Sequence, residues 1–356
     1  EERLGLVPQL LEQLMQSRDR HKSALSAARE SGDDAEAFLQ DQLQYAVKIL
    51  MNSFYGVFAS SFYRFTHADL GASITEWARH NIKKIISDLE EEGHRVVYSD
   101  TDSIFVRAPV DNEAPFNRPI EDDESLIKWE EAKRDTIKFG ENLAGRFTRE
   151  GAELEFETAL SAVFNGAKKR YFGRVVWPRE EMLIRGYEVR RTDSFVLLNR
   201  TMEELFEMIL DGKKWEAVEM SKSVIDDVKA RRTDVADLVI SRSCKGRWDR
   251  DKKEWSFDVY ANPDGLPYVR TAKERIRKGL GFTPGMKVGW IVTDAKVSPM
   301  RISAWLVDET GEEPPTYDPD YYARRLARSL GRITEVFDWD ENELLQGSRQ
   351  QSIFDF

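Results

Sequence analysis

Apolar residues in the first sixty positions recur at spacings of three and four, which is the pattern of amphipathic helices. This spacing predicts helices over 8–30 and 35–55, with Gly56 as a stop signal for the second. Polar residues at 31–34 separate the two helices and predict a tight turn. Residues 1–60 are therefore expected to form an antiparallel helical hairpin.

Residues 61–192 mix helical and strand-like periods. A helical segment is followed by a short β-rich hairpin, an acidic loop that contains proline, a second helical segment and three runs typical of strands. In chain order these elements are a helix at 69–91, a hairpin at 94–108, a loop at 109–125, a helix at 124–148, and strands near 153–158, 170–177 and 182–190. The order predicts an antiparallel sheet with helices beside it.

From residue 193 to residue 340 the pattern is mainly helical, and residues 341–356 form a tail. Thr201 and Glu204 match a capping box, and Gly212 supplies a stop signal. Strands and helices that occupy separate stretches of one chain are typical of the α+β class. We therefore predict an α+β protein.

Residues 96–106 carry the strongest chemical signal in the chain. Two β-branched and aromatic runs flank a polar insert, which predicts a tight hairpin. Residues two apart on a strand or hairpin flank point the same way, so the carboxylates of Asp100 and Asp102 are expected to face one point. Paired carboxylates suit Mg²⁺, which prefers oxygen ligands. A bare Asp-x-Asp is more often an Asp-rich turn, but the flanking Tyr98 and Ser103 favour a metal site.

A second signal lies in residues 45–58. Lys48, Asn52 and Tyr55 recur at spacings of four and three, so they share one face of the predicted helix. Taken alone, this face describes an amphipathic helix with an exposed lysine and a buried tyrosine. The paired acids that follow later in the chain favour a functional face.

Together these segments resemble two motifs of the family B DNA polymerases. Residues 98–103, Tyr-x-Asp-Thr-Asp-Ser, are similar to the metal motif of the palm. Residues 48–56, Lys-x-x-x-Asn-Ser-x-Tyr-Gly, are similar to the motif of the fingers. The resemblance implies a right-hand architecture, with helical-hairpin fingers at 1–60, an antiparallel-sheet palm at 61–192 and a mainly helical thumb at 193–340. It also implies template-directed deoxynucleotidyl transfer.

The resemblance implies a reaction that uses two Mg²⁺ ions. Asp102 would be a direct metal ligand, and Asp100 would have a supporting role. Two-metal phosphoryl transfer needs carboxylates that clamp both ions. The family's other palm motif, an Asp followed by Ser-Leu-Tyr-Pro-Ser, does not occur in this sequence. One bridging Asp is therefore expected from outside the chain.

The resemblance also implies a nucleotide site on the fingers. Lys48 would meet the triphosphate of the incoming nucleotide, Asn52 would support the same helix face, and Tyr55 would pack near the nascent base pair. Arg18 and Lys22 lie four apart in the first predicted helix and would face the same triphosphate. Two cations at this spacing otherwise form a solvated face.

Basic segments in the second half of the chain would contact primer–template DNA. Residues 167–173 resemble the family's Lys-Lys-Arg-Tyr segment, and residues 185–193 match the segment that leaves the palm for the thumb. The DNA-binding residues that the resemblance implies are Lys168, Lys169, Arg170, Tyr171, Arg190 and Arg191. Residues 242–259, with Trp248 and Trp255, form either a basic hairpin that touches DNA or a packed excursion.

The formal net charge of the 356-residue chain is −11, which is unusual for a nucleic-acid enzyme. Cations cluster at 168–191, 242–253 and 273–278, so a basic track in an acidic shell is expected to bind phosphates locally. The alternative is an acidic protein whose charged residues are unevenly distributed without a function in binding. The single Cys244 excludes internal disulfides and multi-cysteine metal modules, and no apolar run is long enough to span a bilayer. We expect a cytoplasmic, nucleoid-associated protein with no membrane role.

We expect that the chain alone does not extend a primer, because a bridging acid is missing from its sequence. Three explanations stay open, namely a polymerase encoded as two polypeptides, a product of protein splicing or cleavage, and an experimental fragment. The expected partners are primer–template DNA, deoxynucleoside triphosphates and an N-terminal polymerase half.

The end of the tail resembles the peptide that docks into a sliding clamp. Gln350, Ile353 and Phe356 follow the spacing Gln-x-x-Ile-x-x-Phe. In such a peptide the apolar side chains fill a pocket while the glutamine sets the register. The usual form ends in two adjacent aromatics, whereas here Phe354 lies two residues before Phe356. An apolar tail without a partner is the alternative.

Two other functions are alternatives to a DNA polymerase, and sequence features distinguish each from it. A non-catalytic scaffold would bind DNA and a clamp with a vestigial active site, but intact Asp100, Asp102, Lys48 and Tyr55 argue against decay. A reverse transcriptase also ends its hairpin in paired acids. Its two aspartates are adjacent, whereas Thr101 separates them here.

Overall fold

The computed structural model describes residues 5–110, 122–148, 154–187 and 193–348. The chain divides into two compact units. The first consists of Glu1–Ala108 and Ala144–Leu154, and the second of Pro109–Leu143 and Glu155–Phe356. The described helices and strands together give the α+β class that the sequence predicts. No helix in the described ranges is both long and apolar enough to cross a membrane.

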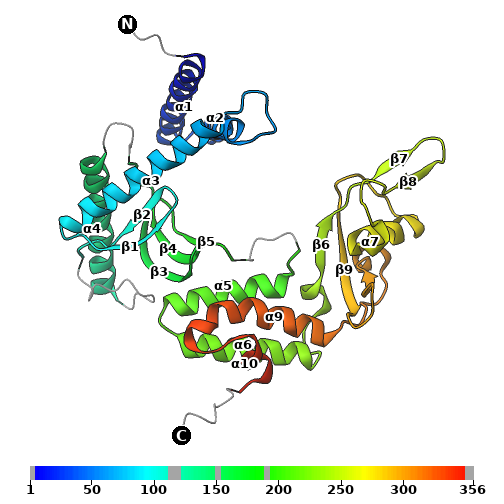
Figure 1. Cartoon of the computed structure of the whole chain (residues 1–356). Helices are drawn as coiled ribbons and strands as arrows, with labels where there is room; N and C mark the ends of the chain where they lie inside the picture. The colour runs from blue at the N-terminus through cyan, green and yellow to red at the C-terminus, as the bar shows by residue number, and fades with distance from the viewer. Residues whose placement is uncertain (1–4, 111–121, 149–153, 188–192, 349–356) are drawn as a thin grey trace. The chain divides into compact units, whose positions relative to one another are not determined.

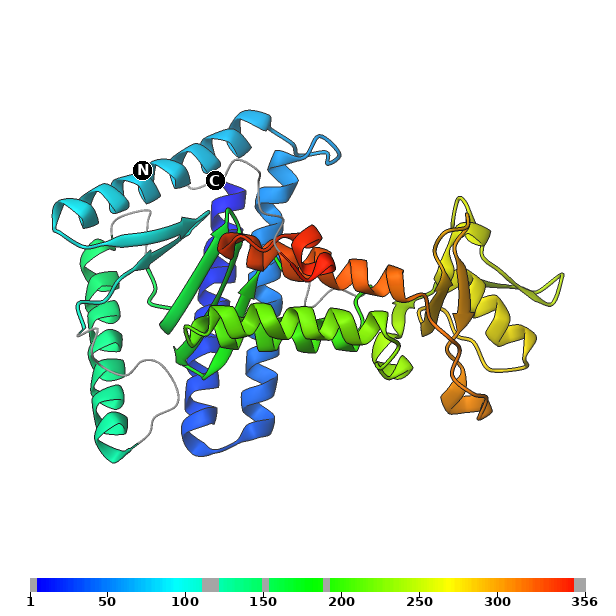
Figure 2. The same ribbon diagram turned by 90° about the horizontal axis from the view of Figure 1, so that it is seen from below.

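Two long antiparallel helices begin the first unit, as predicted (Figures 1 and 2). They are α1 (Leu6–Ser31) and α2 (Asp34–Ala59). Gly32 adopts the left-handed conformation at the end of α1, with a φ of 73°. The Asp33 carboxylate then accepts a hydrogen bond from the Glu36 N–H at 3.0 Å and caps α2. The predicted stop at Gly56 is wrong, because α2 continues to Ala59.

A third helix and a short hairpin complete the first unit. They are α3 (Ala68–Glu91), β1 (Val96–Asp100) and β2 (Ser103–Val106). The two strands are antiparallel and pair Asp100 with Ser103. Helix α3 lies along this hairpin (Figure 1) and buries Ile85 and Leu89. The predicted helix at 69–91 and the predicted hairpin at 94–108 are therefore confirmed.

The second unit begins with a three-stranded antiparallel sheet in the order β3-β4-β5. The strands are β3 (Ala159–Ala167), β4 (Arg170–Trp177) and β5 (Glu181–Arg185), and the preceding helix is α4 (Asp123–Phe147). Trp129 of α4 packs with Ala159 and Val176 of the sheet. Strand β5 ends earlier than predicted, because Gly186 turns the chain with a φ of 74°.

The strand predicted near 153–158 is wrong over the described residues 154–158, since no strand begins before Ala159. The Phe156 ring stacks on Trp177 with 4.9 Å between centroids. It also lies against Gly140 of α4, where an added Cβ would overlap it. The apolar alternation at this point reflects a packed aromatic rather than strand pairing.

Four helices contribute to the main core of the second unit, together with strands and a further helix described below. The four helices are α5 (Val196–Leu210), α6 (Lys214–Lys229), α9 (Pro319–Thr334) and α10 (Glu341–Gln346). The Phe172 ring of β4 packs in a tilted arrangement against Phe206 of α5, with centroids 4.2 Å apart, so the sheet shares this core. One buried cluster thus contains residues from both sides of the predicted boundary at residue 192, and the domain limits stay a prediction.

The predicted capping box at Thr201 is wrong. Thr201 is buried inside α5, which begins at Val196. The predicted stop at Gly212 is confirmed, because Gly212 has a φ of 77° and donates its N–H to the Ile209 carbonyl. Local sequence therefore marked the end of this helix correctly but not its start.

The remainder of the second unit adds strands to a segment predicted as mainly helical. A sheet in the order β10-β9-β6 lies beside α7, and β7 and β8 form a separate hairpin. These elements are β6 (Ile240–Ser243), β7 (Arg247–Asp249), β8 (Glu254–Ser256), α7 (Pro267–Arg277), β9 (Lys287–Asp294), β10 (Arg301–Ala304) and α8 (Val307–Thr310). Short 3₁₀ turns occur at Val235–Leu238, Pro263–Gly265 and Glu335–Phe337.

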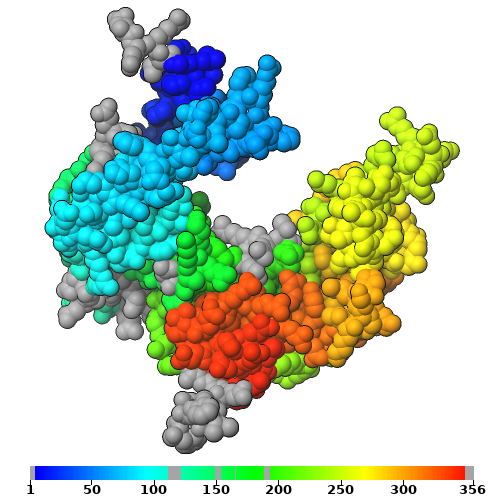
Figure 3. Space-filling view, viewed as in Figure 1, coloured from blue at the N-terminus to red at the C-terminus, as the bar shows by residue number. Residues whose placement is uncertain are grey.

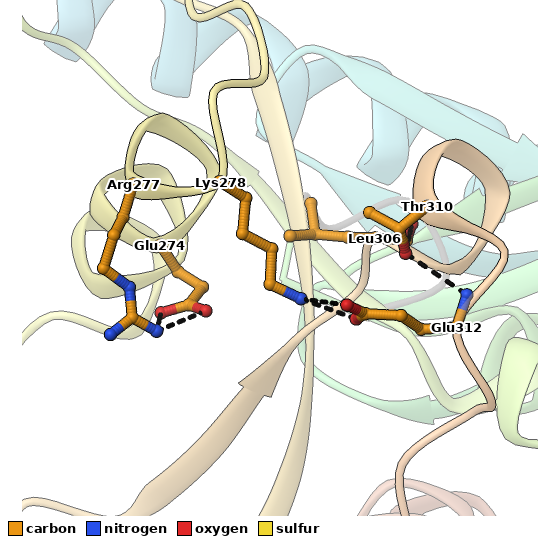
Figure 4. A network of polar contacts seen from close by, with 6 residues as sticks. All are labelled: Glu274, Arg277, Lys278, Leu306, Thr310 and Glu312. Carbon is orange, nitrogen blue, oxygen red and sulfur yellow. Dashed lines mark hydrogen bonds and ion pairs between the residues drawn. The ribbon is translucent and has the colours of Figure 1, made fainter.

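Ion pairs fasten α7 to the segment around α8 (Figure 4). Lys278 binds both carboxylate oxygens of Glu312, at 2.7 and 2.5 Å. The Glu312 N–H in turn donates to the Thr310 hydroxyl at 3.3 Å. The buried Arg275 binds Glu309 on the same segment through two nitrogens. These contacts join parts of the chain more than thirty residues apart.

Candidate functional site

The predicted metal hairpin closes through a turn of two residues, Thr101 and Asp102. Asp100 is the last residue of β1 and lies opposite Ser103. Thr101 has a φ of 57°, which is uncommon for a β-branched residue. The Asp102 N–H donates to the Asp100 carbonyl at 2.7 Å, and the Ser103 hydroxyl donates to the same oxygen at 3.1 Å. These bonds hold the turn in a conformation that costs energy.

The two carboxylates occupy different positions in this turn. Asp100 is half-buried at the strand end, and one of its carboxylate oxygens accepts a hydrogen bond from the Thr101 hydroxyl at 3.2 Å. Asp102 is exposed in the turn itself. The strand periodicity that we used to place both acids therefore applies only to Asp100. The tight turn nevertheless presents both carboxylates at one end of the hairpin.

The chemistry of the pair fits Mg²⁺ in part. Mg²⁺ is often held by one or two carboxylates together with substrate phosphates and water. Within the described ranges, no group of three or more His, Cys, Asp or Glu side chains is arranged to hold a metal ion. Asp100 and Asp102 thus form an incomplete set of protein ligands that further oxygens would have to complete.

The predicted nucleotide face lies on α2. Lys48, Asn52 and Tyr55 are all exposed, and 43% of Tyr55 is accessible. Val47, Met51 and other half-buried residues form a different face of the helix. The three side chains are therefore presented together to solvent, as the helical spacing predicts. The tyrosine is exposed rather than buried, which departs from the amphipathic-helix alternative.

Arg18 of α1 is a second cation of the predicted nucleotide site. It is half-buried, and its Nε atom is buried without a hydrogen-bond partner in the described part of the chain. A buried donor without a partner is costly, so such a group suits an anionic ligand. Lys22 is exposed one turn later on the same helix. Nearby, the His21 Nδ1 and Gln40 Oε1 atoms lie 2.7 Å apart and join α1 to α2.

The predicted DNA-binding lysines form the turn between β3 and β4. Lys168 and Lys169 are exposed, and Lys169 is left-handed with a φ of 63°. Arg170 begins β4 and is half-buried. Tyr171 is only 6% exposed, so its ring positions the strand and offers little surface to a ligand. The turn therefore presents two exposed lysines at the end of the β3–β4 strand pair.

A small cavity beside this turn was not foreseen from the sequence. Its volume is about 10 Å³, roughly the space of one water molecule. It is lined by Arg170, Gly186, Tyr187, Met202, Ser329 and Arg332. The Tyr187 hydroxyl is buried without a hydrogen-bond partner, and burial raises the pKa of Tyr187 to about 12. Arg332 lies far away in sequence, so no local pattern signalled this arrangement.

Several predicted site residues lie outside the described residues. Arg190 and Arg191 belong to the segment 188–192, and Gln350, Ile353 and Phe356 belong to 349–356. Their assignments stay predictions. The remaining site residues divide between the two units, with the acids and the nucleotide face in the first and the lysine turn in the second.

Comparison with known proteins gives a consistent result. The family model for DNA polymerase family B matches residues 1–118 and 125–261, which is more than half of the chain. DNA polymerase 1 of Pyrococcus abyssi is 28% identical over 342 residues, which cover 96% of this chain and 40% of that protein. The DNA polymerase of Thermococcus gorgonarius is 28% identical over 352 residues, which cover 97% of this chain and 41% of that protein. The chain thus spans about two fifths of the length of these relatives.

A solved structure has the same fold. The family B DNA polymerase of Pyrobaculum calidifontis aligns with a TM-score of 0.54 over 94% of this chain and 39% of its own. The sequence identity is 24%, so this likeness concerns the fold. Together with the mixed helices and antiparallel sheets, it confirms the predicted α+β polymerase architecture.

Proposed function

This chain belongs to DNA polymerase family B. We propose that it carries the fingers, the metal-binding turn of the palm and the thumb of a DNA-directed DNA polymerase. The observation that carries the proposal is the Asp100–Asp102 turn. It lies on a hairpin backed by α3, in the same compact unit as the exposed Lys48 face of α2. Paired acids and a cationic face in one unit suit a nucleoside triphosphate and its metal ions.

The proposed reaction joins a deoxynucleotide to a primer. The primer 3′-hydroxyl gives up its proton to water as its oxygen forms a bond to the α-phosphorus. The bond from that phosphorus to the bridging oxygen breaks, and pyrophosphate leaves. When bound, Mg²⁺ supplies stabilisation of the negative charge on the phosphate oxygens. Asp102 and Asp100 would hold it, with the exposed Asp102 as the direct ligand. The protein contributes mainly positioning and electrostatic stabilisation.

The nucleotide is held by cations from both long helices. Lys48, Arg18 and Lys22 bind the triphosphate, and the unpartnered Nε of Arg18 supports this role. Asn52 supports the same face of α2. The exposed ring of Tyr55 packs against the nascent base pair and excludes mispaired geometry. Charge-assisted hydrogen bonds to phosphate are among the strong ones in proteins.

The primer–template is held in the second unit. Lys168, Lys169 and Arg170 bind phosphates at the β3–β4 turn, while Tyr171 positions the strand below them. Arg190 and Arg191, which lie outside the described residues, are proposed to bind phosphates as well. Such contacts fix the register of the DNA and carry no sequence information. The proposed clamp peptide, which contains Gln350, Ile353 and Phe356, would tether the enzyme to a sliding clamp.

We propose that the missing acid ligand comes from the part of a family B polymerase that lies outside residues 1–356. Two observations support this, namely the incomplete acid set in the described residues and the greater length of the relatives. Primer extension tests the proposal, with the chain alone and with a separately expressed complementary N-terminal half. We expect activity only in the mixture.

Matched variants make this test specific. Asp102→Asn is expected to lower activity of the mixture by at least about 10²-fold, because it removes a group that stabilises transition-state charge. Asp69→Asn, which alters an exposed acid on α3, is expected to leave the activity unchanged. Equal activity of the Asp102 and Asp69 variants would contradict the assignment. No activity in a mixture shown to have associated would favour a scaffold that binds DNA and clamp without catalysis.

A further inference from the structure

Tyr187 lies two residues beyond the end of β5 and contacts three parts of the second unit. Its ring meets Phe172 of β4 edge to face, with centroids 5.8 Å apart, and Phe206 of α5 at 5.3 Å. Its hydroxyl group lies close to the turn between β3 and β4, because a Cβ atom added to Gly166 would be only 2.7 Å from it. Tyr187 thus touches both the main core and the turn that carries the two exposed lysines.

The cavity beside this turn, described above, brings together residues that are distant in the chain. Its volume of about 10 Å³ is roughly the space of one water molecule. Strand β4 contributes Arg170 to its lining, and α9 contributes Ser329 and Arg332. Figure 3 shows the orange surface of α9 beside the green surface of the sheet β3-β4-β5. The cavity therefore lies where α9 meets the end of this sheet.

The Tyr187 hydroxyl is the polar group at this cavity whose bonding most needs an explanation. It is buried and has no hydrogen-bond partner in the described part of the chain. Burial raises the pKa of Tyr187 to about 12, so the group is a neutral hydroxyl at pH 7 and can donate a hydrogen bond. A buried donor without a partner is costly, and ordered water satisfies many such groups in proteins.

The lining supplies the other hydrogen-bonding groups that a buried water molecule needs. The guanidinium groups of Arg170 and Arg332 are donors, and the buried Ser329 hydroxyl can accept. A single water can accept hydrogen bonds from Tyr187 and one guanidinium, and it can donate one to Ser329. Three hydrogen bonds are typical of a buried water. The small volume excludes a phosphate or sulfate ion, although two cations line the space.

We propose that one water molecule bridges Tyr187 to Arg170 and Ser329, and that Tyr187 is thereby a positioning residue for the Arg170 guanidinium. Arg170 begins β4, next to the exposed Lys168 and Lys169. The inference rests on the proposed function in one respect, namely that this turn binds primer–template phosphates. Water-mediated hydrogen bonds are nearly as favourable in enthalpy as direct ones. A guanidinium that is held before DNA arrives loses less conformational entropy on binding.

Two measurements on the 356-residue chain test the water. A crystal structure at a resolution that shows ordered water is expected to contain one within hydrogen-bond distance of the Tyr187 hydroxyl. Tyr187→Phe keeps the ring and is expected to lower the melting temperature by roughly 2 to 4 °C, because the water loses a partner. If the hydroxyl had no partner, its removal would raise the melting temperature instead. A higher melting temperature, or a cavity without density, would overturn the proposal.

Melting curves in two salts distinguish water from a chloride ion. Sodium chloride and sodium acetate are compared at equal concentration for the wild type and Tyr187→Phe. We expect the difference between the two proteins to be the same in both salts. A difference that is larger in chloride would assign the cavity to a chloride ion and overturn the assignment to water.

DNA binding tests the positioning role. Fluorescence anisotropy of a labelled primer–template gives the affinity of the chain and its dependence on salt. Tyr187→Phe is expected to weaken binding roughly 3- to 10-fold, the effect of one lost hydrogen bond. The slope of log affinity against log salt is expected to stay unchanged, because no charge is removed. Arg170→Gln is expected to lower this slope by about 1.

A double-mutant cycle identifies the residue through which Tyr187 acts. Tyr187→Phe added to Arg170→Gln is expected to weaken binding no further. Tyr317→Phe is the control, because the Tyr317 hydroxyl donates to the Val228 carbonyl at 3.0 Å in the same unit. This control is expected to lower the melting temperature and to leave DNA affinity unchanged. Additive losses in the cycle, or an equal loss of affinity in the control, would overturn the positioning role.

One further variant separates this inference from the proposed function. Lys168→Gln combined with Lys169→Gln is expected to weaken DNA binding and to lower the salt slope by roughly 2. An unchanged affinity would contradict the proposed DNA-binding turn. The crystal structure and the melting curves would still decide whether a water molecule bridges Tyr187 to α9.

Discussion

Gly186 lies directly against the carbonyl oxygen of Lys169, with no room between them for a Cβ atom. The contact joins the end of β5 to the lysine turn that precedes β4. Gly186 is also left-handed, with a φ of 74°, which a residue with a side chain adopts at a cost. The position of the proposed DNA-binding turn thus depends on a glycine seventeen residues later.

Replacement of Gly186 is expected to destabilise the second unit. In Gly186→Ala the left-handed backbone costs about 1 to 2 kcal/mol, and displacement of the Lys169 carbonyl adds to this. Gly279→Ala is the matched control, because Gly279 has a φ of 75° and open space around it. Urea unfolding followed by circular dichroism measures both free energies. If both variants lost the same free energy of unfolding, the close approach of Gly186 to the Lys169 carbonyl would make no measurable contribution to stability.

Removal of the buried Arg174 is expected to weaken the contact of β4 with α5. Arg174 binds Glu207 at 2.6 Å and Asp211 at 2.8 Å. Burial lowers the pKa of Arg174, but the hydrogen bonds that its guanidinium donates to both carboxylates outweigh burial and raise the pKa. Arg174→Met is expected to cost about 2 to 3 kcal/mol in urea unfolding. This is less than the roughly 3 to 5 kcal/mol for a fully buried pair, because Glu207 is half exposed.

The control for Arg174 is an exposed ion pair of similar length. Arg232 binds Asp227 at 2.6 Å with both side chains largely in solvent. Arg232→Met is expected to cost less than about 1 kcal/mol. If Arg174→Met also cost less than about 1 kcal/mol, the attraction between Arg174 and its carboxylates would only offset the free energy of removing these charges from water.

The ion pair between Arg275 and Glu309 is expected to make stability depend on acid. Its hydrogen bonds hold the pKa of Glu309 below the usual 4.5. A depressed carboxyl pKa in the folded state adds stability above pH 4.5, and this contribution is lost as the pH falls through the folded-state value. Glu309→Gln is therefore expected to lower the melting temperature at pH 7 and to differ less from the wild type in acid.

Melting curves of both proteins from pH 7 down to pH 3.5 measure this convergence. Glu312→Gln, which removes the partner of Lys278, serves as a comparison because Lys278 is more exposed than Arg275. A difference between the wild type and Glu309→Gln that stays constant down to the lowest pH would rule out the ion pair as its source.

Loss of Arg18 is expected to weaken nucleotide binding. Its buried Nε lacks a partner in the described part of the chain, and a charged hydrogen bond to phosphate contributes about 1.5 to 3 kcal/mol. Arg18→Met is therefore expected to raise the Kd of a fluorescent deoxynucleoside triphosphate by roughly 10- to 100-fold, measured with the chain and its complementary half. Arg20→Met, two residues away on an exposed face of α1, is expected to have little effect. An equal rise in Kd for both variants would refute a specific role.

Local sequence determined the elements that depend on few neighbouring residues. The spacing of apolar residues gave the α1–α2 hairpin, and the polar residues 31–34 gave its turn. The same reasoning placed Lys48, Asn52 and Tyr55 on one face, because helical spacing follows from backbone geometry alone. Strand periodicity predicted that Asp100 and Asp102 face one point, but it applies only to Asp100; the tight turn, whose chemistry acts over four residues, is what puts both acids at one hairpin end.

Tertiary structure decided whatever depends on residues distant in the chain. Phe156 stacks on Trp177, so residues 154–158 form no strand despite their alternation. Thr201 is buried inside a helix instead of capping it, because α5 packs into the core that it shares with Phe172. Arg174 and the cavity beside Tyr187 draw their partners from other elements. Periodicity reports only which side of an element is apolar, whereas the shape and charge of whatever covers that side arise when separate elements pack together.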